Sequence, residues 1–213
     1  MGKYEKGILG PFNGKVGTVI GSQWKGITYM RSLPRKSNKA ATQKQLDVQN
    51  KFLQVINFLK PISGLIVDGY QNIKGSLTPF NYAVSYHLKN AISGVSPNFT
   101  INLNKVVISR GELNGLTDAT VASDAANTLH FSWDALSLMG LAKTDDKVSA
   151  LIFEETSGSG FTFQESALRS AGEFLAALPA SFSGQTVNCW ITVKSNDNKL
   201  ISTSAYLGQV VVQ

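Results

Sequence analysis

The spacing of apolar residues changes near Pro97, and this change constrains the fold more than any other feature. From about Thr42 to Pro97 the apolar residues recur every three or four positions, which predicts amphipathic helices. After Pro97, short apolar runs alternate with stretches rich in Gly, Ser, Asp and Asn, which predicts β-strands separated by turns. The order predicts an α+β chain in which helices precede a β-rich body.

Two or three helices are expected before Pro97. The first begins near Thr42 and ends before Pro61. The second has clearer end signals, because Thr78 can cap its first turn and Pro79 suits the first helical position. Between them, residues 62–67 form a short apolar segment that closes at Asp68-Gly69. The expected buried stripes of the two longer helices are Leu46, Phe52, Leu53, Ile56 and Leu59, and Phe80, Val84, Leu88, Ala91 and Ile92.

Seven short strands are expected in the C-terminal half of the chain. They lie near residues 103–109, 128–133, 147–154, 160–164, 174–178, 186–194 and 200–212. This number of short strands predicts an antiparallel two-sheet sandwich of the immunoglobulin or fibronectin type III kind. The weak periodicity of residues 168–178 leaves a short helix open as an alternative there.

A β-hairpin is expected at the N-terminus, because residues 16–22 and 26–31 are β-branched and aromatic runs joined by a polar link. In an unbroken first strand, Gly17 and Gly21 share one face. Two glycines on one face leave a groove that suits either a close-lying backbone or an aromatic ring, for which Trp24 or Tyr29 is the nearest candidate.

The net charge of +6 is unevenly distributed along the 213 residues. Residues 1–40 hold eight Lys or Arg and one Glu, a net charge of +7. Residues 41–95 carry +3 and residues 96–213 carry −4. Together with the change of period, the charge predicts three parts: a basic Gly-rich hairpin (1–40), a helical segment (41–95) and a β-sandwich (96–213).

The composition argues against several classes of protein. Cys189 is the single cysteine and His87 and His130 are the only histidines, so neither an internal disulfide nor a structural zinc site is expected. No apolar run approaches the ~20 residues of a membrane helix, and no signal-peptide core is present. The expected location is the cytoplasm, with export by a route that needs no cleavable signal left open.

The residues with potential catalytic chemistry are poorly placed for it. The segment 10–15 resembles a phosphate-binding loop, but it is one residue short between its glycines and precedes a strand. His87 and His130 are expected at boundary or surface positions, and Cys189 is expected to be a buried, inert thiol. The pairs Asp145-Asp146 and Glu154-Glu155 fall at strand ends or turns, where solvated charge is the usual outcome. No enzymatic activity, metal or cofactor is therefore expected.

The N-terminal segment G-I-L-G-P-F-N-G-K-V-G-T-V-I-G (residues 7–21), followed by Trp24-Lys25-Gly26, Tyr29-Met30-Arg31-Ser32 and Pro34, resembles a family of uncharacterised Bacteroidota proteins. That family is classed as a domain of unknown function and is similar over most of the chain, including Ser109-Arg110-Gly111 and the final strands. The resemblance implies a bacterial source and makes the hairpin a defining part of the protein type. It implies no activity and no functional residues.

The basic N-terminal segment is the main candidate for function. The leading hypothesis is a non-enzymatic structural protein that self-associates, or docks a protein partner, by placing this hairpin against the acidic body of the next copy. The alternative is nucleic-acid binding, in which the cations follow the phosphates and aromatic rings stack on bases. The candidate interaction residues are Lys15, Gly17, Gly21, Trp24, Lys25, Tyr29, Arg31, Arg35 and Lys36.

Overall fold

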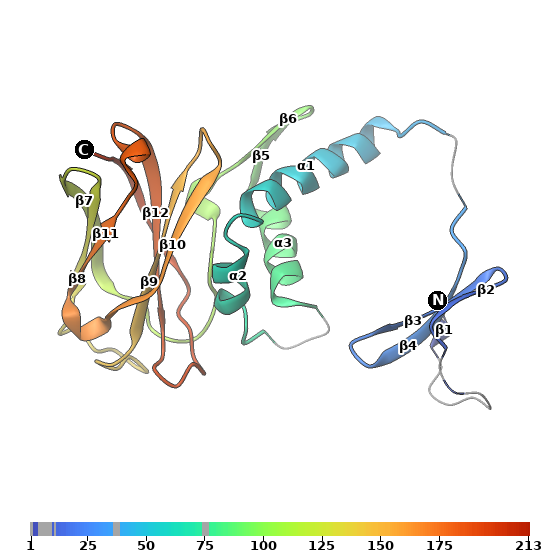
Figure 1. The fold of residues 1–213 in the computed structure, drawn as a ribbon, viewed down its shortest axis with the longest axis horizontal. Helices are drawn as coiled ribbons and strands as arrows, with labels where there is room; N and C mark the ends of the chain where they lie inside the picture. The colour runs from blue at the N-terminus through green and yellow to red at the C-terminus, as the bar shows by residue number, and fades with distance from the viewer. Residues whose placement is uncertain (1, 4–9, 11, 36–38, 74–76) are drawn as a thin grey trace. The chain divides into compact units, whose positions relative to one another are not determined.

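The computed structural model describes residues 2–3, 10, 12–35, 39–73 and 77–213. The chain forms two compact units, Met1–Thr42 and Gln43–Gln213 (Figure 1). The second unit contains both the helical segment and the C-terminal strands. Lys36, one of the candidate interaction residues, lies outside the described residues.

The N-terminal unit is an antiparallel four-stranded sheet in the order β1-β4-β3-β2. Its strands are β1 (Gly2–Lys3), β2 (Gly14–Val16), β3 (Val19–Trp24) and β4 (Ile27–Ser32). The expected hairpin is confirmed as β3 and β4. Its turn is Lys25-Gly26, and both residues have positive φ, 46° and 78°. Two such residues form the type I′ turn whose twist suits a tight hairpin.

A turn at Gly17 divides the first run of the hairpin, which the sequence suggested was one strand. Gly17 has φ of 60° and lies between β2 and β3, so it does not share a strand face with Gly21. Gly21 is buried, and a Cβ atom there would overlap the carbonyl oxygen and ring of Phe12. The prediction that Trp24 or Tyr29 packs on this glycine is wrong. Phe12 does so instead, because Trp24 and Tyr29 belong to the opposite face of the sheet.

The expected helices are confirmed in the second unit. They are α1 (Gln43–Leu59), α2 (Ser63–Gly69) and α3 (Pro79–Asn90). The Oγ1 atom of Thr78 accepts a hydrogen bond from the backbone N–H of Asn81 at 3.2 Å, so the predicted cap of α3 is also confirmed.

Helix α1 buries less of its apolar stripe than expected. Leu46, Phe52 and Leu53 are 40%, 48% and 55% exposed. The buried residues of α1 are Val55, Phe58 and Leu59, all in its last turns. Only this end of the helix therefore enters the core, and the periodicity of the sequence could not distinguish it from the exposed end.

The β-rich body contains two larger antiparallel sheets and one small hairpin. One sheet has the order β11-β8-β7, with β7 (Thr117–Ala125), β8 (Thr128–Asp134) and β11 (Glu173–Ala177). The other has the order β10-β9-β12-β13, with β9 (Lys147–Glu154), β10 (Ser159–Leu168), β12 (Thr186–Lys194) and β13 (Ala205–Val211). The hairpin is β5 (Ile92–Val95) and β6 (Asn98–Ile101).

Six of the seven expected strands are confirmed as β8 to β13. The strand expected at 103–109 is wrong, because that segment starts with a 3₁₀ turn at Leu103–Lys105. The alternative of a helix over 168–178 is also wrong, because a 3₁₀ turn at Arg169–Ala171 leads directly into β11. Strand β7 and the hairpin β5–β6 were not expected. In β7 the residues are mostly Thr, Ala, Ser and Asp, which give little apolar alternation.

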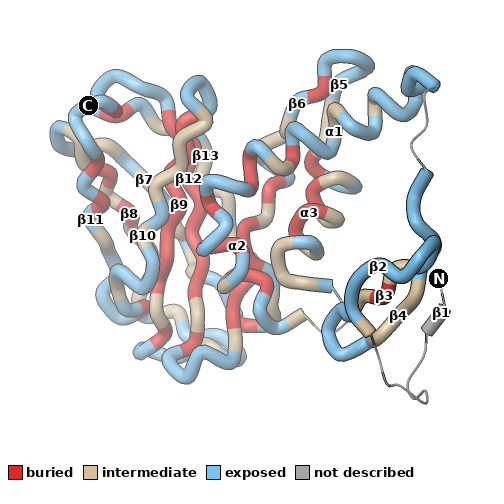
Figure 2. The backbone as a smooth tube through the Cα atoms, turned by 45° about the vertical axis from the view of Figure 1, so that its right-hand side comes forward, coloured by how far each residue is buried: buried red, intermediate tan, exposed pale blue. Residues whose placement is uncertain are grey.

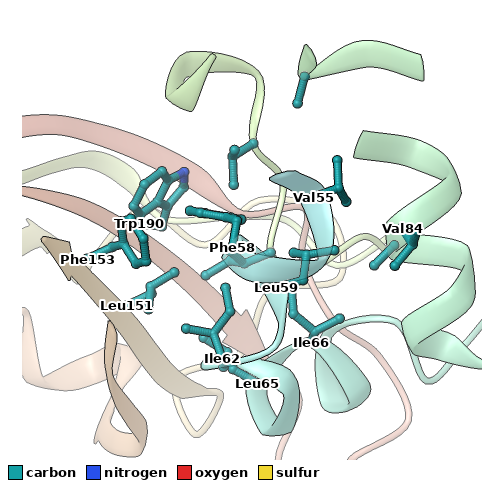
Figure 3. Close-up of a cluster of buried hydrophobic side chains, with 14 of the residues drawn as sticks. Val55, Phe58, Leu59, Ile62, Leu65, Ile66, Val84, Leu151, Phe153 and Trp190 are labelled. Carbon is teal, nitrogen blue, oxygen red and sulfur yellow. The ribbon is translucent and has the colours of Figure 1, made fainter. Parts of the chain in front are cut away.

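Strands β9 and β12 are buried along nearly their whole length (Figure 2). Their alternate residues face two different cores. The first group packs with β8 and β11 between the two sheets, and consists of Val148, Ala150, Ile152, Val187, Cys189, Ile191 and Val193. The second group packs against the helices, and consists of Leu151, Phe153 and Trp190 (Figure 3). The ring of Phe58 from α1 meets that of Phe153 at 4.8 Å between centroids, in an edge-on arrangement.

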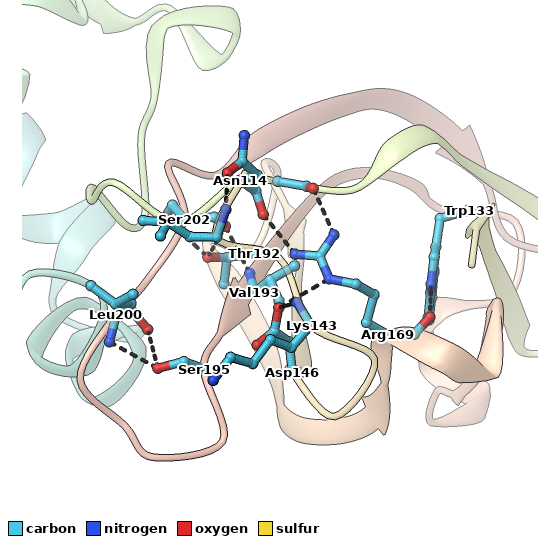
Figure 4. A network of polar contacts seen from close by, with 12 residues as sticks. Asn114, Trp133, Lys143, Asp146, Arg169, Thr192, Val193, Ser195, Leu200 and Ser202 are labelled. Carbon is cyan, nitrogen blue, oxygen red and sulfur yellow. Dashed lines mark hydrogen bonds and ion pairs between the residues drawn. The ribbon is translucent and has the colours of Figure 1, made fainter. Parts of the chain in front are cut away.

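A buried ion pair closes one end of the two-sheet core (Figure 4). The Nε of Arg169 donates to Oδ2 of Asp146 at 3.1 Å, and the side chains are 1% and 0% exposed. The two terminal nitrogens of Arg169 donate to the carbonyl oxygens of Gly115 and Asn114, at 2.8 and 2.6 Å. Trp133 donates its indole N–H to the Arg169 carbonyl at 2.7 Å. The arginine thereby joins the turn after β10 to the segments before β7 and β9.

Two of the four paired carboxylates are therefore not solvated, contrary to expectation. Asp146 is fully buried, and Glu154 is 6% exposed. The Glu154 carboxylate accepts hydrogen bonds from the backbone N–H groups of Thr156 and Ser157, both at 2.9 Å. Hydrogen bonding to Ser157 and Thr156 lowers the pKa of Glu154. Both carboxylates serve to fix turns at the ends of β9.

We predict that Asp146→Ala lowers the free energy of unfolding by about 3–5 kcal/mol, because it leaves the Arg169 charge buried without its partner. The matched control is Asp145→Ala, one residue away, because that side chain is exposed and, among the described residues, accepts a hydrogen bond from Asn196 alone. The control should change stability by about 0.5 kcal/mol or less. Urea denaturation measures both, and equal effects would contradict a structural role for the pair.

Candidate functional site

The pairing register of the N-terminal sheet collects aromatic and basic side chains on one face. Residues directly opposite each other in antiparallel strands share a face. Ile20 is opposite both Lys15 and Arg31, Ser22 is opposite Tyr29, and Trp24 is opposite Ile27. We call this surface the basic–aromatic face and define it by Lys15, Ile20, Trp24, Ile27, Tyr29 and Arg31.

The basic–aromatic face leaves large apolar groups in contact with solvent. Trp24 is 49% exposed and Ile27 is 40% exposed. Tyr29 is half-buried, while Lys15 and Arg31 are exposed. Apolar surface surrounded by cations is typical of a surface that contacts a partner.

The sequence placed four of these six residues in the candidate site, Lys15, Trp24, Tyr29 and Arg31, and the structure brings them together. It missed Ile20 and Ile27, although the alternation along the strands could have found them.

The other candidate interaction residues lie elsewhere in the N-terminal unit. Gly17 and Lys25 are in the two turns, and Gly21 faces the opposite side under Phe12. Arg35 is exposed and follows the end of β4. These residues shape or border the sheet, and they do not belong to the basic–aromatic face.

The outer surface of the sheet β11-β8-β7 has the opposite character. Its three strands contain four acidic residues and no Lys or Arg. In β8, Leu129, Phe131 and Trp133 are buried, so the side chains that alternate with them point outward. The residues of β7 and β11 that pair with these outward residues share their face. We call this surface the acidic face and define it by Thr120, Ala122, Asp124, His130, Ser132, Glu173, Leu175 and Ala177. Most of these side chains are small, and Leu175 is 65% exposed.

His130 lies at the centre of the acidic face, between carboxylates from both neighbouring strands. Its Nδ1 is 3.1 Å from Oδ2 of Asp124, and its Nε2 is 3.0 Å from Oε2 of Glu173. Both ring nitrogens can donate only when the imidazole is protonated. The hydrogen bonds to Asp124 and Glu173 accordingly raise the pKa of His130 above its ordinary value of 6.5. The expected position of His130 on the outward side of a strand is confirmed. Because its ring bridges Asp124 on β7 and Glu173 on β11, we call these three residues the His130 clip.

We predict that the His130 clip stabilises the protein below pH 6.5 and that this contribution disappears as the pH rises through the raised pKa of the folded state. The effect should be about 1 kcal/mol or less, because the carboxylates are largely exposed. As the pH rises from below 6.5 through the raised pKa of His130, the midpoint of urea unfolding should fall less in His130→Gln than in the unaltered chain. An identical pH dependence in both proteins would contradict the clip.

The remaining titratable candidates have structural roles. His87 was expected at a boundary or surface position, but it is fully buried. Its Nδ1 donates to the carbonyl oxygen of Ala83 at 2.7 Å, and its Nε2 accepts from the N–H of Val107 at 3.3 Å. Burial lowers the pKa of His87, which favours this neutral form. Cys189 is buried as expected, and burial raises the pKa of its thiol to about 12. A thiol with this pKa is not an activated nucleophile at neutral pH.

The described part of the chain contains neither a metal-binding cluster nor a membrane-spanning helix. Within residues 2–3, 10, 12–35, 39–73 and 77–213, three or more His, Cys, Asp or Glu side chains nowhere gather in a way that could hold a metal ion. In the same part of the chain, the helices are too short or too polar to cross a lipid bilayer.

These features define an α+β protein with three α-helices in its described part and several antiparallel sheets. The chain belongs to DUF6266, a family of unknown function that matches residues 11–208. None of the curated proteins matches it. Among solved structures, the solution structure of the fn3 domain of human collagen alpha-1(XX) chain is similar at 12% sequence identity, over 47% of this chain and 87% of that one, with a TM-score of 0.30. Membership confirms the expected resemblance to a domain of unknown function, and the Bacteroidota source stays a prediction.

Proposed function

We propose that this chain is a non-enzymatic assembly protein that docks through the basic–aromatic face of its N-terminal sheet. The observation that supports the proposal is the strand register, which places Trp24, Ile27 and Tyr29 beside Lys15 and Arg31 on one exposed surface. A sheet this small leaves apolar side chains in water, and covering them with a partner removes that cost.

The proposed partner is the acidic face of a second copy. Small side chains such as Ala122 and Ala177 make that surface flat, which suits the bulky rings of the basic–aromatic face. Asp124 and Glu173 offer the carboxylates that Lys15 and Arg31 would pair with, and Leu175 offers an apolar contact. The contact joins different surfaces on the two copies, so repetition gives rings or filaments.

The size of the two faces predicts a weak contact. Strands spaced about 4.8 Å apart, with about 3.4 Å per residue, give each face an area of roughly 300 Å². Two such faces bury roughly 600 Å² in total, well below the ~1,200 Å² of stable complexes. The assembly should therefore depend strongly on concentration and on salt.

We further infer that the body is a sandwich of the fibronectin type III kind. What supports this is the division of seven strands into a sheet of three, β11-β8-β7, and a sheet of four, β10-β9-β12-β13. The apolar core shared by these sheets is also typical of such sandwiches. In this arrangement the acidic face is the outer surface of the smaller sheet.

Nucleic-acid binding is the second candidate, and it is favoured by the presence of Trp24 and Tyr29 between two cations. Single-stranded nucleic acids bind surfaces that combine stacking rings with positive charge. Protein docking accounts for more of this face, because Ile27 is 40% exposed and lies beside the rings of Trp24 and Tyr29. Exposed aliphatic groups of this kind offer nothing specific to a phosphate backbone.

The proposal is tested by reversing charges on the two faces. Lys15→Glu with Arg31→Glu makes the first face acidic, and Asp124→Lys with Glu173→Lys makes the second face basic. Each double variant alone should sediment as a monomer, because like charges then face each other. An equimolar mixture of the two should recover the assembly formed by the unaltered chain, which analytical ultracentrifugation would detect.

The control reverses two exposed charges outside both faces, Lys60→Glu with Lys105→Glu, and should leave assembly unchanged. A chain that stays monomeric at high concentration would contradict self-association. Binding of a single-stranded oligothymidylate that is lost in Lys15→Glu with Arg31→Glu would instead support the nucleic-acid alternative.

A further inference from the structure

The segment Ser109-Arg110-Gly111 holds an arginine at a fixed place beside helix α3. The backbone N–H of Arg110 donates to the carbonyl oxygen of Gly69 at 2.9 Å, at the end of α2. Ser109 donates its hydroxyl to the carbonyl oxygen of Ser202 at 2.8 Å. A Cβ atom on Gly111 would overlap the carbonyl oxygen of Ile201, so the chain passes close to this strand-like segment. The backbone of Arg110 is thus anchored at its own N–H and on both sides.

The side chain of Arg110 has no comparable structural task. The residue is exposed, and its guanidinium lies 5.6 Å from the centroid of the Tyr86 ring. Within the described part of the chain, no carboxylate forms an ion pair with it. Ser109 and Gly111 therefore stabilise the fold. Arg110, in contrast, extends a positive charge that no described carboxylate pairs with, from a backbone that is held in place.

A groove of about 470 Å³ opens between Arg110 and one side of α3. Helix α3 contributes Tyr82, Ser85, Tyr86 and Lys89, whose spacing of three and four residues places them on one side of the helix. No Asp or Glu is among the described residues that line this groove.

A second groove, of about 560 Å³, adjoins the first and shares Tyr82 and Arg110 with it. It adds the cation of Lys199 and the hydroxyl of Thr203, together with one carboxylate, Glu112. The two volumes lie in the range of small-molecule sites, ~300–1,000 Å³.

We propose that the groove between Arg110 and α3 binds an oxyanion, a phosphate or carboxylate group carried by a small molecule. The guanidinium of Arg110 supplies paired N–H donors that match two oxygens of such a group. Lys89 adds a second positive charge, and the hydroxyls of Ser85 and Tyr86 are further donors. This site belongs to the second unit, and its existence does not depend on docking by the N-terminal sheet.

The test is isothermal titration of the full-length protein with inorganic phosphate and, separately, with citrate, each against chloride at matched ionic strength. Arg110→Gln should weaken binding about tenfold or more, because it removes a charge-assisted pair of hydrogen bonds. Lys89→Gln tests the second cation without touching the anchored segment. The matched control is Lys51→Gln, because the Lys51 ammonium also lies over an aromatic ring, 4.7 Å from the centroid of Phe99, but outside the groove.

Phosphate binding that is weakened by Arg110→Gln and Lys89→Gln, and unchanged by Lys51→Gln, would support the proposal and assign a phosphate. The same pattern with citrate alone would support it and assign a carboxylate. Absence of binding for both anions would overturn it, as would binding that Arg110→Gln leaves intact. Loss of anion binding in Lys15→Glu with Arg31→Glu alone would also overturn it, because the anion would then sit on the basic–aromatic face.

Discussion

The double burial of β9 and β12 is the constraint on which the rest of the body depends. Each strand sends alternate side chains to opposite sides, so the pair needs a cover on both. The sheet β11-β8-β7 covers one side and the ends of the helices cover the other. Phe58 packs edge-on against both Phe153 and Trp190 in the second core. Removing either cover would expose a continuous apolar surface, and this explains why the helical segment and the strands form one unit.

The N-terminal unit shows the opposite situation, because no core of comparable size is buried among its described residues. Gly21 is its one buried residue among those described, where Phe12 lies against the sheet. A single small sheet is marginally stable by itself unless its apolar face is covered. Docking on the acidic face of another copy would supply that cover, and the charges of the two surfaces favour it. Assembly and the stability of the N-terminal sheet are then two aspects of the same contact.

Local signals in the sequence predicted those parts of the fold that depend on neighbours along the chain. Thr78 and the following proline define the start of α3, and alternation defines β8. Strand β7 escaped detection because its Thr, Ala and Ser side chains carry no strong apolar pattern. The ion pair between Asp146 and Arg169 could not be predicted from the sequence, because the two residues meet only after the sheets have packed. For the candidate site, the composition of the basic segment correctly located the cations and aromatic rings. The face on which each side chain lies depends on the turn at Gly17, which the sequence did not reveal. The contact between Phe12 and Gly21 could not be inferred either, because it joins residues that pack only in the folded sheet.

The fluorescence of Trp24 tests the central claim most directly. Trp133 and Trp190 are 6% and 0% exposed, so Trp24, at 49%, is the tryptophan open to a soluble quencher. If the basic–aromatic face docks on a second copy, acrylamide quenching should decrease as protein concentration rises, and Asp124→Lys with Glu173→Lys should abolish the decrease. Quenching that is the same at every concentration would contradict docking between copies.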